Sequence, residues 1–291
     1  MRRSLPETQK DLNARNRRSL SELSTDEIVK ACEQNYINYW RCVGASPNAE
    51  FSDGKITQCI TGVRQDVFNV VLKCNLDPGD IDARLDGAIE QYRSRRIPVL
   101  WHAGLLSEPR DIGRHLEARG FPHDYDLAAM AVDLDSVNSG LDFSRFVSVK
   151  TVTNGADCKL WAECLASSWE SPRETAPWML QNACFNIPLE REIGASLPRR
   201  MYLGMLEGRP ASATMLVWSD DIAGLEMVGT VHSARSKGVG TAIIRTALAD
   251  ARAMGFRFVV VLSTIEGLRL YEKSGFREFG KLPEHTIEFK E

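Results

Sequence analysis

The segment ARSKGVGTAI, residues 234–243, places two basic residues and two glycines directly before a helix-like run. The first N–H groups of a helix have no partner inside the helix, and they lie at the positive end of the helix dipole. Gly238 and Gly240 carry no side chain that would keep an anion from these groups, and Arg235 and Lys237 add positive charge. The segment therefore predicts a phosphate-binding loop at the start of a helix.

Two widespread phosphate-binding patterns do not fit this loop. The dinucleotide fingerprint GxGxxG requires a third glycine at the position of Ile243. The P-loop pattern requires Gly-Lys followed by Ser or Thr, and neither tripeptide occurs in the chain. The loop must therefore belong to another class.

Alternating strands and helices surround the loop in the second half of the sequence. We expect a strand at 146–152, helices at 156–168 and 176–185, hairpin-connected strands over 201–231 with breaks at 207–210 and 219–221, a helix at 238–254 closed by Gly255, a strand at 256–263, and a last helix over 265–275. The loop then joins a strand to a helix, as an anion-binding turn requires.

The first half shows a comparable order of elements. We expect a helix from Ser24 to Trp40 with a Ser24–Glu27 capping box, a polar loop at 44–55, strands at 56–63 and 67–76, a helix at 77–96 opened by a turn, a buried strand at 97–104, a helix at 109–121 closed by Gly120, a strand at 124–134, and a linker at 135–140. Both halves thus predict mixed α/β structure.

The two halves resemble each other most at their strand–helix–glycine units. When Gly120-Phe121 is aligned with Gly275-Phe276, Glu117 meets Glu272 and Arg114 meets Arg269. We interpret this match as an internal duplication. The alternative is chance, because a strand followed by a helix and a closing glycine is common in α/β proteins.

The loop with its flanking elements resembles the GNAT N-acetyltransferase family. Residues 235–240, RSKGVG, match the family motif R-x-x-G-x-G/A, and LYEKSGF at 270–276 matches its L-Y-E-x-x-G-F signature. The resemblance is good over 201–280 and weaker over 146–200. It implies an α/β fold with a mixed (α+β) sheet, built here as two tandem GNAT-like domains. We divide the chain into a basic, poorly ordered leader at 1–23, a degenerate domain at 24–135 and a catalytic domain at 141–291.

The resemblance also implies a cofactor site for acetyl-CoA, without a metal. The family pairs the pantetheine arm with a splayed strand, which carries Thr230 and Val231 here, and often has a polar residue near the coenzyme at the position of Ser263 and Thr264. The pyrophosphate is held by the amides of the loop, which comprises Arg235, Ser236, Lys237, Gly238, Val239, Gly240 and Thr241. His232 replaces a frequent proline, and we expect its side chain to be exposed.

Two side chains are candidates for proton transfer. Tyr271 matches the tyrosine that often protonates the leaving thiolate, and a phenol with a pKa near 10 keeps its proton at neutral pH. Glu226 is the candidate base for an ammonium acceptor, whose pKa is also near 10. The alternatives are a core aromatic for Tyr271 and a solvent-facing carboxylate for Glu226.

The first half lacks the corresponding site. Asp77, Asp80 and Asp82 occupy the matching loop, where they suit a helix start but repel a pyrophosphate, and Leu116 aligns with Tyr271. We therefore expect the first domain to bind no coenzyme A and to form a wall of the acceptor cleft. Trp161, Trp169 and Trp178 are either core residues or part of an apolar acceptor pocket.

Composition limits the remaining classes of function. The net charge of −3 argues against nucleic acid as a partner, and the basic leader is the one local exception. The seven cysteines include no CxxC pair, so we interpret them as buried apolar residues in a reducing compartment. We expect a cytoplasmic monomer or homodimer, without a signal peptide or membrane segment, that acetylates a small-molecule or peptide amine. A coenzyme A-binding sensor or subunit without catalysis is the alternative.

Overall fold

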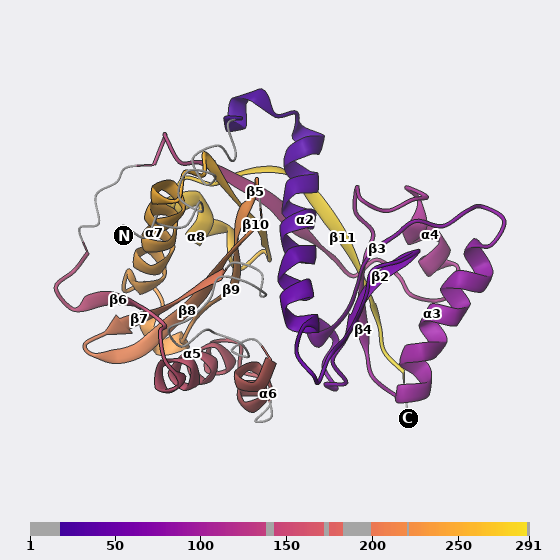
Figure 1. The fold of residues 1–291 in the computed structure, drawn as a ribbon, viewed down its shortest axis with the longest axis horizontal. Helices are drawn as coiled ribbons and strands as arrows, with labels where there is room; N and C mark the ends of the chain where they lie inside the picture. The colour runs from indigo at the N-terminus through magenta and orange to yellow at the C-terminus, as the bar shows by residue number, and fades with distance from the viewer. Residues whose placement is uncertain (1–17, 138–142, 172–174, 183–198, 220, 290–291) are drawn as a thin grey trace, which may run out of the picture.

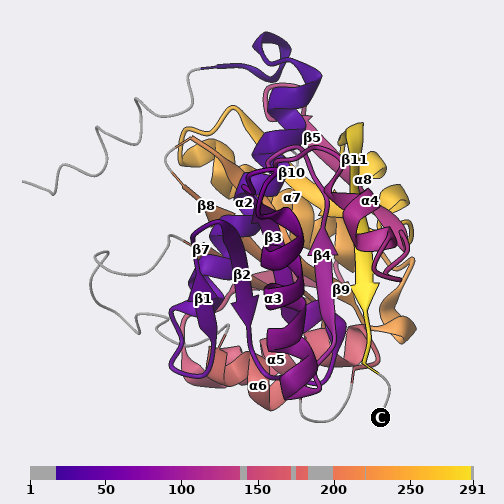
Figure 2. The same ribbon diagram turned by 90° about the vertical axis from the view of Figure 1, so that its right-hand side faces the viewer.

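A single mixed β-sheet runs through the molecule (Figures 1 and 2). The computed structural model describes residues 18–137, 143–171, 175–182, 199–219 and 221–289. In spatial order the strands are β1 (Glu50–Ser52), β2 (Ile56–Ile60), β3 (Asn69–Cys74), β4 (Val99–His102), β11 (Arg277–Ile287), β5 (Tyr125–Asp133), β10 (Phe258–Ser263), β9 (Ala223–Thr230), β8 (Arg209–Trp218), β7 (Arg199–Leu206) and β6 (Val147–Thr151). The predicted α/β fold with a mixed sheet is confirmed.

The two halves of the chain exchange strands in the middle of this sheet. Strand β11, from the C-terminal end, pairs antiparallel with β4 and β5 of the first half. Strand β5, from the first half, pairs antiparallel with β10 of the second. The sheet is therefore continuous across the predicted division between 24–135 and 141–291, and each half supplies a strand that borders a strand of the other.

Helix α2 (Thr25–Gly44) lies at the centre of the molecule. Figure 1 shows α7 (Val239–Ala253) and α8 (Leu268–Lys273) on one side of it, and α3 (Ile81–Arg95) and α4 (Ile112–Glu117) on the other. Residues of α2 share one core with α5 (Gly155–Ser168) and with strands of both halves. A second core packs α7 and α8 on the other face of the second half, and a third packs α3 and α4 in the first. Helix α2 therefore touches both halves from the same side of the sheet.

The predicted capping box at the start of α2 is present. The Glu27 amide donates to Ser24 Oγ at 3.3 Å, and the Ser24 amide donates to Glu27 Oε2 at 2.8 Å. The helix continues to Gly44, one turn beyond the predicted end, because Val43 and Cys42 are still buried. That extra turn anchors the helix between the two halves.

Three local expectations need correction. Glu50–Ser52, in the predicted polar loop, forms the edge strand β1, which exists through its pairing with β2. Leu20–Glu22, in the leader expected to be poorly ordered, forms a short 3-10 helix, η1, with Leu20 buried; residues 1–17 lie outside the described ones. Asp80 starts α3 but does not cap it, because its carboxylate accepts from Arg84 instead.

The other expected elements are present, within a few residues of the predicted ends. Helix α6 (Thr175–Asn182) starts as expected, and its predicted end at 183–185, like linker residues 138–140, lies outside the described part of the chain. Six cysteines are buried, as expected, and Cys184 lies outside the described residues. Among the helices described, none is both long and apolar enough to cross a bilayer.

Candidate active site

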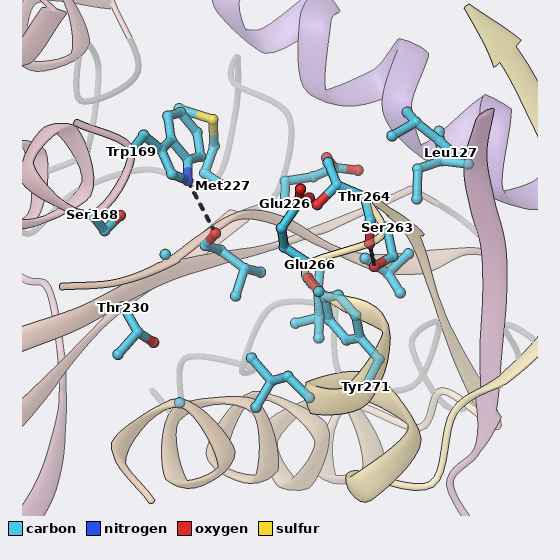
Figure 3. A pocket seen from close by; sticks show the side chains of 18 of the residues that line it. Leu127, Ser168, Trp169, Glu226, Met227, Thr230, Ser263, Thr264, Glu266 and Tyr271 are labelled. Atoms are coloured by element: carbon cyan, nitrogen blue, oxygen red, sulfur yellow. Dashed lines mark hydrogen bonds between the residues drawn. The ribbon is translucent and has the colours of Figure 1, made fainter. Parts of the chain in front are cut away.

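A cavity of about 990 Å³ lies between the two halves, and Figure 3 shows part of its lining. The first half contributes residues from α2, β4, β5 and η2 (Asp66–Phe68). The second half contributes residues from β9, the 234–241 loop, β10, α8 and the segment after α5. The first half thus forms a wall of this cavity.

Two parallel strands separate at the cavity. Strands β9 and β10 pair only through Val259–Ala223 and Val260–Gly224. Beyond these pairs β9 contains a bulge opposite β8, where Met227 has a φ of 55°. The far ends of both strands line the cavity, with Thr230 on β9 and Ser263 at the end of β10. The splay therefore leaves a gap in the sheet that an extended ligand can enter.

The basic loop closes one end of this gap. Ser236 and Gly238 have positive φ values of 62° and 84°, so the chain turns sharply before α7 begins at Val239. The first helical bond of α7 is donated by the Ala242 amide to the Gly238 carbonyl at 3.0 Å. The three preceding amides, at 239–241, therefore have no acceptor within the helix. They suit an anion at this helix start.

Gly240 keeps the loop close to the splayed strand. A Cβ at this position would lie 3.1 Å from Thr230 Oγ1 and 3.4 Å from the Leu270 side chain. Thr230 Oγ1 is itself held 3.0 Å from Ser212 Oγ. Glycine at 240 therefore lets the start of α7 pack closely against Thr230 and Leu270, beside the cavity that Gly240 lines.

The arginine of the loop has a structural role as well as a charge. Its Nε donates to the Thr230 carbonyl and its Nη2 to the Ser168 carbonyl, both at 3.3 Å. Arg235 therefore ties the loop to β9 and to the end of α5. His232 is exposed, as expected.

Most of the predicted cofactor residues line the cavity, and three do not. The lining includes Thr230, Arg235, Ser236, Gly238, Gly240, Thr241 and Thr264. The Val231 amide donates to the Ala211 carbonyl at 2.9 Å, and Val239 is fully buried in the core. Lys237 is exposed outside the lining. The side chains of Val231, Lys237 and Val239 thus lie outside the cavity lining, although the amide of Val239 is one of the three open amides at the start of α7.

Glu226 is a buried carboxylate on the cavity wall. Its side chain is 8% exposed, and Asn35 Nδ2 donates to Glu226 Oε1 at 2.7 Å. Burial raises the pKa of Glu226 to about 8, although the hydrogen bond from Asn35 lowers it in part. The alternative of a solvent-facing carboxylate is therefore wrong. A carboxyl with this pKa can accept a proton and return it near neutral pH.

Tyr271 reaches the same cavity from the opposite face of the sheet. It lies on α8, is 5% exposed, and packs edge-on against Phe276 with ring centroids 5.4 Å apart. Burial, followed by the charge of Glu226, raises the pKa of its phenol well above the ordinary value. Figure 3 shows its ring directed from α8 toward the strand that carries Glu226. Tyr271 is thus both a core aromatic and a cavity residue that keeps its proton.

The matching place in the first half is filled by the chain itself. The Glu108 amide donates to the Cys74 carbonyl at 2.8 Å, and the Leu76 amide donates to the Glu108 carbonyl at 2.9 Å. This segment closes the space beside β3 that the splay leaves open beside β9. Leu116, at the position of Tyr271, is fully buried. The acidic loop and the filled gap both support the expectation that this half holds no coenzyme A.

Sequence reasoning missed the contribution of α2 to the cavity. Asn35, Tyr36 and Tyr39 come from a helix predicted only as an amphipathic element, and their spacing alone does not distinguish a core face from a cavity wall.

The three tryptophans were expected either in the core or in an apolar pocket, and they differ in this respect. Trp161 is a core residue whose Nε1 donates to the Thr214 carbonyl, and Trp169 lines the cavity. Trp178 packs beside Phe68, with centroids 4.7 Å apart.

Comparisons with known proteins agree with this geometry. Residues 160–276 match the model of the acetyltransferase (GNAT) family. No curated protein matches the chain by sequence.

Solved structures match the fold of nearly the whole chain. A GCN5-related N-acetyltransferase from Kribbella flavida aligns with a TM-score of 0.64 and 13% identity, over 89% of this chain and 96% of that protein. A tandem GNAT protein from the clavulanic acid biosynthesis pathway aligns with a TM-score of 0.58 and 14% identity, over 91% of this chain and 97% of that protein. A GCN5-related N-acetyltransferase from Sphaerobacter thermophilus gives a TM-score of 0.57 and 15% identity, over 89% and 91%. At these identities the likeness concerns the fold.

Proposed function

We propose that this chain, which belongs to the GNAT acetyltransferase family through residues 160–276 and has the fold of a tandem GNAT protein over 91% of its length, is an enzyme. It transfers an acetyl group from acetyl-CoA to the amine of a small molecule or peptide. The observation that carries the proposal is the pairing, across one splayed gap, of a buried carboxylate with a raised pKa and a neutral phenol. Membership of the family supports an acyl-CoA as the donor.

The loop supplies the binding end of the site. Acetyl-CoA brings an activated thioester, and the chain must hold it by its phosphates and leave its acyl end in the gap. The unpaired amides at 239–241 and the space over Gly240 suit the pyrophosphate, with Arg235 bracing the loop. Thr230 and Thr264 line the two sides of the gap beyond it.

Glu226 acts as the base in this proposal. An amine arrives as an ammonium ion and must lose a proton before its nitrogen can attack the thioester carbonyl. A carboxylate with a pKa of about 8 is a better base near neutral pH than an ordinary carboxylate. Asn35 donates to Oε1 of this carboxylate, and we assign the uptake of the proton to its other oxygen, Oε2.

Tyr271 acts as the acid. As the new C–N bond is completed, the C–S bond breaks and the sulfur leaves as a thiolate. The phenol donates its proton to that sulfur, and the nitrogen of the tetrahedral intermediate releases the proton that restores the phenol. Because burial holds the pKa of Tyr271 high, the phenol is present in its protonated form before the reaction.

The experiment measures acetyl transfer and coenzyme binding separately. Tyr271→Phe is expected to lower kcat for an amine panel with acetyl-CoA while leaving the Kd for coenzyme A nearly unchanged. Calorimetry is expected to show one bound coenzyme A per chain, because the first half has no open gap. Coenzyme binding without transfer to any amine would instead identify a sensor or a subunit.

A further inference from the structure

One part of the cavity has a wall of aromatic side chains from the first half of the chain. This aromatic wall consists of Tyr36, Tyr39, Trp40, Phe68 and Tyr125. The Tyr39 hydroxyl donates to Met227 Sδ of β9 at 3.1 Å. The wall therefore lies beside the strand that contains Glu226. The wall therefore faces the position that an acceptor amine must occupy.

A second carboxylate lies at this end because of the strand exchange. Glu284 of β11 has His102 of β4 as its partner on one side and Tyr125 of β5 on the other. Its side chain lines the cavity and is fully buried, with Oε1 2.8 Å from His102 Nδ1. Among the described residues, neither oxygen of Glu284 has a hydrogen bond of good geometry. A buried carboxylate in this state favours positive charge nearby.

Tyr36 of the aromatic wall lies near both carboxylates. Its ring centroid lies 5.1 Å from that of His102, the neighbour of Glu284. Burial raises the pKa of Tyr36, and the charges of Glu284, Glu226 and Asp66 raise it further. Burial also raises the pKa of Tyr125, and the neighbouring Glu284 raises it further. The acidic groups Glu284, Glu226 and Asp66 therefore lie near this part of the cavity.

The basic residues of the cavity belong to its other end. Arg235, Arg269 and Lys273 come from the loop and from α8, where the phosphates of the donor are expected. Of the described residues with which the first half lines the cavity, none is lysine or arginine. Among the described residues, every lysine or arginine of the lining thus comes from the donor end, which also contains Glu170 and Glu266.

From this distribution of charged residues we infer that the acceptor is a small cationic amine with an apolar or aromatic body and no anionic group beside the amine. The inference rests on the proposed function and names its acceptor class. A cation is attracted both to aromatic rings and to the two carboxylates. An acceptor with a carboxylate, such as a free amino acid, would bring a second negative charge into a buried site that offers it no described lysine or arginine.

The test uses the full chain saturated with coenzyme A. Calorimetry compares phenethylamine, a cation at neutral pH, with 3-phenylpropionate, a similar molecule of opposite charge. The amine is expected to bind about tenfold more tightly or better. Tyr36→Leu, which removes the ring and keeps an apolar side chain, should weaken the amine several-fold, whereas Tyr36→Phe should retain its affinity. Coenzyme A affinity should be the same in all three proteins.

Equal binding of the two probes, tighter binding of the acid, absence of binding by the amine, or an unchanged amine affinity in Tyr36→Leu would each overturn the inference. The proposed function is tested apart from it, by turnover with phenethylamine and phenylalanine as acceptors. Acetylation that prefers phenylalanine would leave the acetyltransferase in place and remove the inferred acceptor class. Amine binding without any acetylation would contradict the proposed transferase activity, and only the preference of the cavity for a cationic amine would remain.

Discussion

At the scale of single residues, the proposed acetyl transfer depends on two ionisable groups that are removed from water. Glu226 and Tyr271 are both buried on one cavity, and burial is the first cause of the raised pKa of each. The carboxyl thereby becomes a base suited to neutral pH, and the phenol keeps its proton. The same loss of solvation disfavours the carboxylate form of Glu226 and the phenolate form of Tyr271. The carboxyl therefore takes up a proton more readily, and the phenol releases its proton less readily.

Glu226→Gln is expected to lower kcat/KM by about 100-fold or more, because the amide cannot accept the ammonium proton. In the unmodified protein kcat/KM should rise with pH up to about 8, as Glu226 loses its proton, and then level off. The measurement is a pH–rate profile with saturating acetyl-CoA. Glu266→Gln is the matched control, because Glu266 is an exposed carboxylate on the same cavity. A variant profile that keeps the rise to pH 8 would show that another group is the base.

The same substitution, Glu226→Gln, should lower activity but raise the free energy of unfolding. The ordinary pKa of 4.5 holds in the unfolded chain, and the folded value is about 8. Below pH 4.5 both states carry the proton; as pH rises to 8, the unfolded state releases it first, so the native protein loses stability, by up to about 1.4 kcal/mol per pH unit. Glu226→Gln should therefore gain free energy of unfolding relative to the native protein between pH 5 and 8 in denaturant titrations. An advantage that stays constant across this range would contradict the raised pKa.

At the scale of elements, the loop between β9 and α7 is proposed to bind the coenzyme through its backbone amides. Its positive φ values and the missing side chain at 240 leave three helix-start amides open, and Arg235 fastens the loop to two other elements. The corresponding turn before α3 has an acidic sequence, and the segment up to Glu108 fills its gap. A binding loop thus needs both the turn and an open space beside it.

Gly240→Ala should weaken coenzyme A binding about tenfold or more, because the new Cβ lies 3.1 Å from Thr230 Oγ1 and 3.4 Å from Leu270 and would displace Thr230 or the start of α7. The fold should survive, since residue 240 is helical and alanine favours a helix over glycine. Calorimetry with coenzyme A and a thermal melt separate the two effects. Gly87→Ala, in α3 with nothing within 4 Å of the new Cβ, is the control and should stabilise the chain by roughly 0.5–1 kcal/mol without affecting binding. Unchanged affinity in Gly240→Ala would place the phosphates elsewhere.

At the scale of the whole molecule, the strand exchange makes the two halves one structural unit. Strand β11 covers the edges of β4 and β5, and β5 covers the edge of β10. Helix α2 adds Asn35, whose bond to Glu226 joins residues 191 positions apart. The first half thus supplies both the residue that binds Glu226 and the aromatic wall of the cavity.

Residues 138–291 expressed alone should aggregate, because β10 and β11 would both expose edges normally paired with β5 and β4. Residues 1–137 alone should fail in the same way. Co-expression of the two fragments should yield a 1:1 complex with the circular dichroism spectrum of the intact chain, as size-exclusion chromatography would show. Two fragments that are each folded and monodisperse alone would contradict this dependence.

The sequence by itself determined the features that depend on near neighbours along the chain. The capping box of α2, the glycine turns at Gly120 and Gly275, the loop before α7 and the candidates Glu226 and Tyr271 all follow from local patterns. Only the tertiary structure decided that Glu226 is buried, that Asn35 of α2 donates to it, and that β11 places Glu284 in the cavity beside the aromatic wall. The physical reason is that strand order and helix docking depend on burial and pairing between distant segments, which no local spacing in the sequence specifies.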